Sequence, residues 1–196
     1  MKSGFIAIVG RPNVGKSTLM NKLIKEKVAI VSDKAGTTRD QIKGIINIGE
    51  NQYIFMDTPG IHKPKHLLGE HMTNVALDTL NNADLILFML DGTQGISTGD
   101  MFVNENAKNS NTPIVLIINK IDKMTDKDIA LKLEEVKEKL GEFAGIITMT
   151  GEYGIGVHKI FEISEKYLSN DMWFYPEDYY TDLPVNKIVV ETIPTI

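Results

Sequence analysis

The fold is decided by residues 10–17, which read Gly10-Arg11-Pro12-Asn13-Val14-Gly15-Lys16-Ser17. Two glycines with four residues between them, followed by Lys and Ser, match the phosphate-binding loop that joins a strand to a helix. The glycines let the backbone curl, so that consecutive N–H groups and the start of the next helix converge on a polyphosphate. Lys16 is then expected to reach the outer phosphates, and Ser17 to ligate magnesium.

Short apolar runs alternate with stretches of helical period on both sides of this loop. The alternation predicts an α/β fold, a six-stranded and mostly parallel sheet with helices on both faces. Residues 49–52 separate two of the strands as a hairpin, which gives the sheet one antiparallel edge strand. The expected strands are Phe5–Val9, Ile42–Ile48, Tyr53–Met56, Leu85–Leu90, Ile114–Ile118 and Ile146–Met149. The expected helices are Ser17–Lys25, Glu70–Asn81, Asp100–Asn109, Lys127–Leu140 and Val157–Tyr167.

The segment from residue 170 to residue 196 breaks this alternation. It holds five of the fourteen aromatic residues and is interrupted by Pro176, Pro184 and Pro194. Because proline interrupts regular pairing, we expect a connector after a domain that spans residues 1–169. Five acids against one lysine from Asp171 onward favour packing on the domain over stacking on bases.

Composition excludes several classes of protein. With 196 residues, 42% apolar or aromatic and 24% charged, and no cysteine, the chain is neither disordered nor a disulfide scaffold. A net charge of −5 excludes an electrostatic nucleic-acid binder as a whole. The longest apolar run, Leu85–Leu90, is too short to span a bilayer, and the N-terminus shows no cleavable pattern. These features predict a cytoplasmic protein.

A second motif, Asp57-Thr58-Pro59-Gly60, directly follows the strand Tyr53–Met56. A carboxylate at the end of a strand beside the phosphate loop holds magnesium through water, and Gly60 offers its N–H to the terminal phosphate. Taken alone, the same four residues are equally typical of an ordinary turn.

A third motif, Asn119-Lys120-Ile121-Asp122, follows the buried strand Ile114–Ile118, at the edge where open α/β sheets bind ligands. Asp122 can accept hydrogen bonds from N1–H and the exocyclic amino group of guanine, a pair of donors that adenine lacks. Asn119 is expected to brace the loop, and the stem of Lys120 to lie over the base. The motif favours GTP over ATP and argues against a kinase that phosphorylates a metabolite.

Together these residues make the chain similar to the P-loop GTPases of Ras-like fold, and within them to the Era family of bacterial ribosome-assembly GTPases. The resemblance is carried by GRPNVGKS, by GTTRD at 36–40, DTPGIHKPK at 57–65, NKID at 119–122 and FYPEDYYTDLP at 174–184. Der-like and MnmE-like GTPases, which share the first four motifs but not the last, are the alternative.

The resemblance implies further residues of a GTP-hydrolysing site. Thr38, with Thr37 as the alternative, is the switch threonine that meets magnesium and the γ-phosphate in the GTP state, so the metal ligands are Ser17, Thr38 and Asp57. Ile61 stands where a water-positioning Gln is usual, and Asn13 helps bind a potassium ion instead. The implied catalytic set is Lys16, Thr38, Gly60 and Asn13. The nucleotide site adds Thr18, Ile61 and the base-binding pair Thr150-Gly151, which stands where the family has Ser-Ala.

The resemblance also implies a biological role and partners. It implies a molecular switch in small-subunit ribosome assembly and rRNA maturation, with GTP or GDP, Mg²⁺ and K⁺ as ligands. The rRNA contacts of the family are made mainly by a KH-type domain, of which no pattern occurs before Ile196. A monomer is implied, in the cytoplasm or peripherally at the inner face of the cell membrane. Because Ile61 replaces glutamine, a module that holds GTP with little cleavage is a further alternative.

Overall fold

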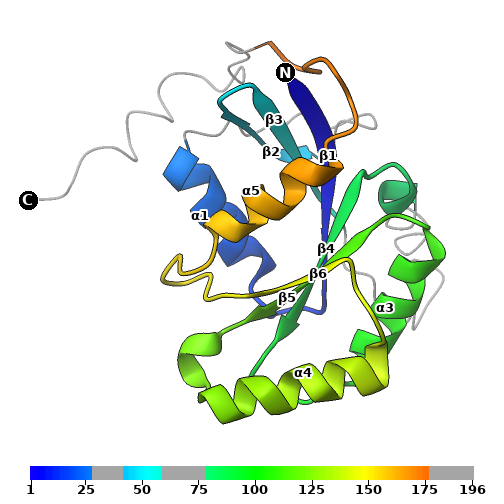
Figure 1. The fold of residues 1–196 in the computed structure, drawn as a ribbon, viewed down its shortest axis with the longest axis vertical. Helices are drawn as coiled ribbons and strands as arrows, with labels where there is room; N and C mark the ends of the chain where they lie inside the picture. The colour runs from blue at the N-terminus through cyan, green and yellow to red at the C-terminus, as the bar shows by residue number, and fades with distance from the viewer. Residues whose placement is uncertain (28–41, 59–77, 177–196) are drawn as a thin grey trace, which may run out of the picture.

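The computed structural model describes residues 1–27, 42–58 and 78–176, and a six-stranded sheet forms its centre (Figure 1). The strand order is β2-β3-β1-β4-β5-β6. The strand β2 is antiparallel to β3, and all other neighbours are parallel. This confirms the predicted α/β sheet with one antiparallel edge strand. The strands are β1 (Lys2–Val9), β2 (Ile42–Ile48), β3 (Asn51–Asp57), β4 (Leu85–Asp91), β5 (Ile114–Asn119) and β6 (Gly145–Thr148).

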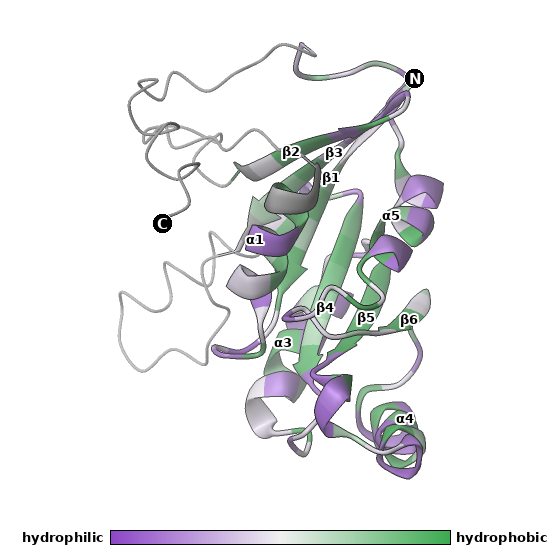
Figure 2. Ribbon diagram, turned by 90° about the vertical axis from the view of Figure 1, so that its left-hand side faces the viewer, coloured by the Kyte–Doolittle hydropathy of each residue, from purple (hydrophilic) through white to green (hydrophobic). Residues whose placement is uncertain are grey.

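Helices cover both faces of this sheet. Side chains of α1 (Lys16–Lys27) and α5 (His158–Ser164) share a core cluster with one face of β1, and those of α3 (Thr98–Asn109) and α4 (Asp126–Leu140) share one with the other. Every residue of β4 is buried, as a central parallel strand requires, and the central strands are green in Figure 2. Residues 78–81 are helical, and the rest of the helix expected over 70–81 lies outside the described residues.

Two expected boundaries are wrong in an informative way. The hairpin loop is only Gly49-Glu50, because Ile48 pairs with Asn51 and leaves two residues to turn the chain. Gly49 adopts a φ of 58°, which suits glycine at such a turn. The helix expected over 157–167 is α5 followed by a 3₁₀ turn over Glu165–Tyr167.

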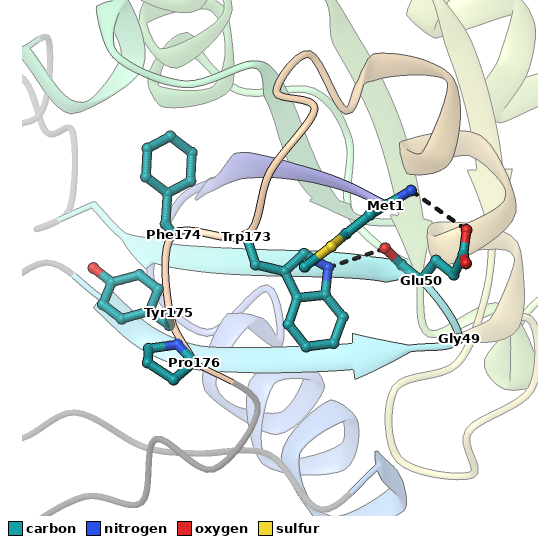
Figure 3. Close-up of a pocket in the computed structure, with 7 residues that line it drawn as sticks. All are labelled: Met1, Gly49, Glu50, Trp173, Phe174, Tyr175 and Pro176. Atoms are coloured by element: carbon teal, nitrogen blue, oxygen red, sulfur yellow. Dashed lines mark hydrogen bonds and ion pairs between the residues drawn. The ribbon is translucent and has the colours of Figure 1, made fainter.

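Residues 170–176 pack against the hairpin and the first strand (Figure 3). Gln52, which is fully buried, accepts hydrogen bonds at Oε1 from the N–H groups of Phe174 and Tyr175, at 3.0 and 3.1 Å. The indole N–H of Trp173 donates to the Glu50 carbonyl at 3.0 Å. These contacts agree with the expectation that the start of this segment packs on the domain. Residues 177–196 lie outside the described residues.

No helix within residues 1–27, 42–58 and 78–176 has the length and apolar character that crossing a membrane requires.

Candidate nucleotide site

The phosphate loop, the start of the DTPG motif and the NKID motif meet at one edge of the sheet. The parallel strands β1, β3, β4 and β5 all end there, because parallel neighbours point their carboxyl ends the same way. Asp91 and Asn119 are the last residues of β4 and β5, and the segments that follow β1, β3 and β5 carry the phosphate loop, Thr58 and residues 120–122. Residues far apart in the sequence therefore share one site.

Two glycines give the phosphate loop its tight path between β1 and α1. Gly10 and Gly15 have φ angles of 151° and 110°. A Cβ atom on Gly10 would lie 2.5 Å from the Met89 carbonyl oxygen, and one on Gly15 would lie 2.2 Å from Nδ2 of Asn119. Any side chain at either position would therefore collide with a neighbouring strand or its following loop.

Lys16 lies over this loop at the start of α1. Its Nζ donates to the carbonyls of Gly10 and Arg11, at 2.6 and 2.8 Å. Ser17 and Thr18 are exposed in the first turn of the helix, where the backbone N–H groups have no partner inside the helix. A cationic side chain, exposed hydroxyls and a helix start together suit a polyanion.

Asn119 ties the phosphate loop to the loop after β6. Its Nδ2 donates to the Val14 carbonyl at 2.8 Å, and its Oδ1 accepts from the Gly151 N–H at 2.9 Å. The side chain is buried, so both contacts are shielded from water. This bracing was expected for Asn119. The Gly151 N–H, which the family resemblance assigns to guanine O6, is engaged here with Asn119.

Lys120 lies beside the phosphate loop and is paired with an acid. It adopts a left-handed backbone conformation, with φ of 66°, and Nζ donates to the Asn13 carbonyl at 3.1 Å. The same ammonium bonds Oδ2 of Asp91 at 2.6 Å. Burial raises the pKa of Asp91, but the hydrogen bonds from Lys120 and Thr93 outweigh burial, and the pKa is lowered. Asp91 is therefore an anion at neutral pH.

Asp122 follows in a single 3₁₀ turn over Ile121–Lys123, with its side chain exposed at the same edge. The other base-loop residues, Thr150 and Gly151, are held from both sides: the Thr150 N–H donates to the Ile155 carbonyl at 3.1 Å, and Gly151 donates to Asn119. The exposed Asp122 carboxylate thus lies beside a base loop whose backbone is held by hydrogen bonds.

The DTPG motif is described only in part. Asp57 ends β3 and pairs with Ile8 of β1, and Thr58 Oγ1 donates to the Ile8 carbonyl at 2.7 Å, which anchors the motif to the strand before the phosphate loop. Thr37, Thr38, Pro59, Gly60 and Ile61 lie outside the described residues. The Ser17 hydroxyl and the Asp57 carboxylate are oxygen donors of the kind that Mg²⁺ prefers, so their chemistry fits this ion. The described residues hold no group of three or more acidic, His or Cys side chains that would form a separate metal site.

Three residues of the site belong to none of the motifs. Asp91 holds Lys120, as above, while Asp100 and Gln94 accept from Nε and Nη2 of Arg11, at 2.9 and 3.3 Å. For Asp91 the sequence does hold a signal, an acid that directly follows a buried strand at this edge. For Asp100 the spacing Ser97-x-x-Asp100 indicates a helix cap, and nothing in the sequence points to Arg11.

Comparison with known proteins adds a family to this geometry. Residues 5–120 match the model of the family described as 50S ribosome-binding GTPase. The chain belongs to this family of GTPases. Within the family, the chain is 55% identical over 194 residues to GTPase Era of Fusobacterium nucleatum subsp. nucleatum, which covers 98% of the chain and 66% of that protein. The resemblance to the Era GTPases is thereby confirmed.

Solved structures of Era GTPases share the fold. The Aquifex aeolicus Era variant crystallised with GDP·AlF4⁻ is 42% identical and superimposes with a TM-score of 0.78, covering 97% of this chain and 65% of that one. An Era complex with MgGDPNP and nucleotides 1506–1542 of 16S rRNA is 43% identical, with a TM-score of 0.78, covering 94% and 63%. The chain thus spans just under two thirds of the length of these relatives.

Proposed function

We propose that this chain is the GTP-binding and GTP-hydrolysing domain of an Era-type switch that acts in assembly of the small ribosomal subunit and in rRNA maturation. The similarity to Era proteins crystallised with guanine nucleotides and with 16S rRNA supports the proposal. The aromatic segment at 174–184 favours this group over Der-like and MnmE-like GTPases.

The observation that carries the nucleotide assignment is the double hydrogen bond of Asn119. Through Val14 it holds the loop that would bind phosphates, and through Gly151 it holds one of the loops that would bind the base. Asp122 lies three residues after Asn119. A nucleotide has its phosphates and base at opposite ends of one ligand, and a rigid link between the two loops suits such a molecule. The exposed Asp122 carboxylate supplies the acceptor that selects guanine.

Hydrolysis is assigned to the residues around the phosphate loop. Lys16 neutralises the outer phosphates, Gly60 donates its N–H to the terminal phosphate, and Thr38 closes on it in the GTP state. Ser17, Thr38 and Asp57 would hold Mg²⁺, which when bound neutralises phosphate charge. The side chain of Ile61 has no amide group that could orient water. We therefore assign potassium binding to Asn13, which is exposed and has a left-handed φ of 64° on the loop.

The rest of the biological assignment follows the resemblance. We assign residues 1–169 to the GTPase domain and 170–196 to a connector toward a KH domain. The KH domain would make most of the rRNA contacts. The protein would act as a monomer in the cytoplasm, with peripheral association at the inner face of the membrane as a further property to test.

Asp122→Asn tests the base assignment. A carboxylate accepts from the guanine amino group, whereas an asparagine amide donates to the carbonyl that xanthine carries at the same position. We therefore expect the variant to bind XDP more tightly than GDP, while the wild-type chain prefers GDP over both XDP and ADP. Fluorescence titration with labelled nucleotides measures this. Asp126→Asn, which removes an exposed acid four residues further on, is the matched control and should keep the GDP preference. Unchanged preference in Asp122→Asn would show that this residue does not read the base.

A further inference from the structure

The first turn of α3 holds a buried acid that reaches the phosphate loop. Asp100 is only 2% exposed, and its two oxygens have different partners. Oδ2 accepts from the Ser97 N–H and hydroxyl, at 2.9 and 2.7 Å, and so closes the capping box of α3. Oδ1 accepts from Nε of Arg11 at 2.9 Å. One carboxylate thus joins a helix start to the loop that follows β1.

The surface around Asp100 is shaped to receive the Arg11 side chain. Gln94 accepts a second hydrogen bond from the guanidinium, at 3.3 Å. Gly99 leaves room for the stem, because a Cβ atom there would lie 2.8 Å from Cδ of Arg11. The Arg11 side chain is 28% exposed and the Asp100 side chain 3%, so the pair is partly shielded from water and poorly screened by salt.

The segment between β4 and α3 is itself fixed at its other end and along its length. Asp91 bonds Lys120, as described above, and Lys132 and Glu135 of α4 hold the Gln94 carbonyl and the Ile96 N–H, at 2.5 and 2.9 Å. Asp100 therefore has little freedom to follow Arg11 if the phosphate loop moves.

We infer that Asp100 is a positioning residue for the nucleotide site, which holds the phosphate loop in its binding conformation through Arg11. The inference rests on the proposed function, and adds to it a residue outside every GTPase motif. Arg11 precedes Pro12 and Asn13, so its anchoring fixes the part of the loop in which Asn13 lies. Removing Arg11 leaves Asp100 buried without its counter-charge, and removing the Asp100 charge leaves the Arg11 guanidinium without its ionic partner. Either change therefore favours a different loop conformation.

The chain offers a matched control in α4. Asp128 closes the capping box of that helix with Thr125 at the same distances, 2.9 Å to the N–H and 2.7 Å to the hydroxyl, and it is exposed and far from the phosphate loop in sequence. Asp128→Asn thus repeats the loss of a helix cap without touching Arg11. Asp100→Asn removes the same cap together with the acid that Arg11 needs.

The experiment compares both variants by the dissociation rate and Kd of fluorescent GDP, and by thermal unfolding. We expect Asp100→Asn to raise the dissociation rate and the Kd of GDP about tenfold each, and Asp128→Asn to change either by less than about twofold. In the Arg11→Ala background Asp100→Asn should add almost nothing, because the two residues act through one contact. The same dissociation rate and the same Kd of GDP in wild type and Asp100→Asn would overturn the inference.

Gly99→Ala separates positioning from stability. Alanine favours the helix over glycine, so the variant should unfold at a temperature equal to or above that of the wild type. Its Cβ atom displaces the Arg11 stem while leaving Asp100 and the cap intact, so GDP should dissociate about tenfold faster. Unchanged dissociation would contradict the role of Arg11.

Amide hydrogen exchange without nucleotide distinguishes failure of this inference from failure of the proposed function. If Asp100 positions the loop, amides 13–16 exchange faster in Asp100→Asn than in Asp128→Asn, whether or not GDP binds. Equal exchange in the two variants overturns the inference. Absence of GDP binding to the wild-type chain would overturn the proposed function instead.

Discussion

Asn119 shows how single residues at this site serve two loops at once. Its amide donates to Val14 and accepts from Gly151, and a residue that has only donors or only acceptors could keep one of these contacts but not both. Gly15 is its necessary neighbour, since any side chain there would occupy the position of the Asn119 amide. The requirement for Asn is therefore geometric at this position.

Glu135 is a second residue whose environment matters, because its hydrogen bonds lower its pKa. Burial raises its pKa, but hydrogen bonds from Lys132, Ile96 and Lys139 together outweigh burial and lower the pKa from 4.5 to about 2. The folded state therefore binds this proton less tightly than the unfolded state. It follows that the stabilisation is present above pH 4.5 and is lost as the pH falls toward about 2.

We predict that Glu135→Gln lowers the free energy of unfolding at pH 7 by on the order of 1 to 3 kcal/mol, and that its deficit shrinks as the pH falls through this window. Urea unfolding of variant and wild type from pH 7 down to pH 2.5 measures both effects. Glu138→Gln, on the exposed side of the same helix, should follow the wild-type curve. A deficit in Glu135→Gln that is independent of pH would indicate a packing effect instead.

At the scale of elements, the edge of the sheet places the site and the hairpin places the connector. Gln52 points its amide from β3 to residues 174 and 175 and is fully buried there. We predict that Gln52→Ala leaves the Phe174 and Tyr175 amides without these acceptors, so that they exchange about tenfold faster. Hydrogen exchange measures the amides, and the fluorescence of Trp173, the single tryptophan, reports the same release.

The control for this prediction is Asn51→Ala on the same strand. Asn51 contacts Glu165 at 3.0 Å on the exposed side, so its removal should leave the amides of residues 174 and 175 unchanged. If both variants, or neither, released the segment, Gln52 would not be what fastens it to β3.

The elements were largely predictable because apolar runs and caps are local signals. All six strands follow from continuous or alternating apolar runs, and the loop GRPNVGKS follows from its glycines and lysine. The side chains that hold the loop did not follow. Arg11 and Asp100 are 89 residues apart, and their contact depends on the packing of α3 against the sheet. The predicted hairpin loop is two residues too long because Asn51 and Gln52 are polar, whereas both pair with β2 and Gln52 is buried against residues 174 and 175.

At the scale of the whole molecule, the chain spans just under two thirds of the length of the Era proteins that it matches, and the described residues include the phosphate loop and the NKID motif of the proposed nucleotide site. The net charge of −5 gives the chain no general attraction for RNA. The proposed rRNA role is therefore not explained by the charge of this chain, whereas the proposed nucleotide chemistry rests on residues within it.

The measurement that tests the central claim most directly is single-turnover cleavage of GTP by the purified chain with Mg²⁺, in potassium and in sodium, with ATP as the control. We predict that GTP is cleaved to GDP and phosphate, faster in potassium, and that ATP is left intact. Equal cleavage of ATP would contradict guanine recognition through Asp122. Binding of GTP without cleavage in either salt would contradict hydrolysis by this domain and leave a module that only holds the nucleotide.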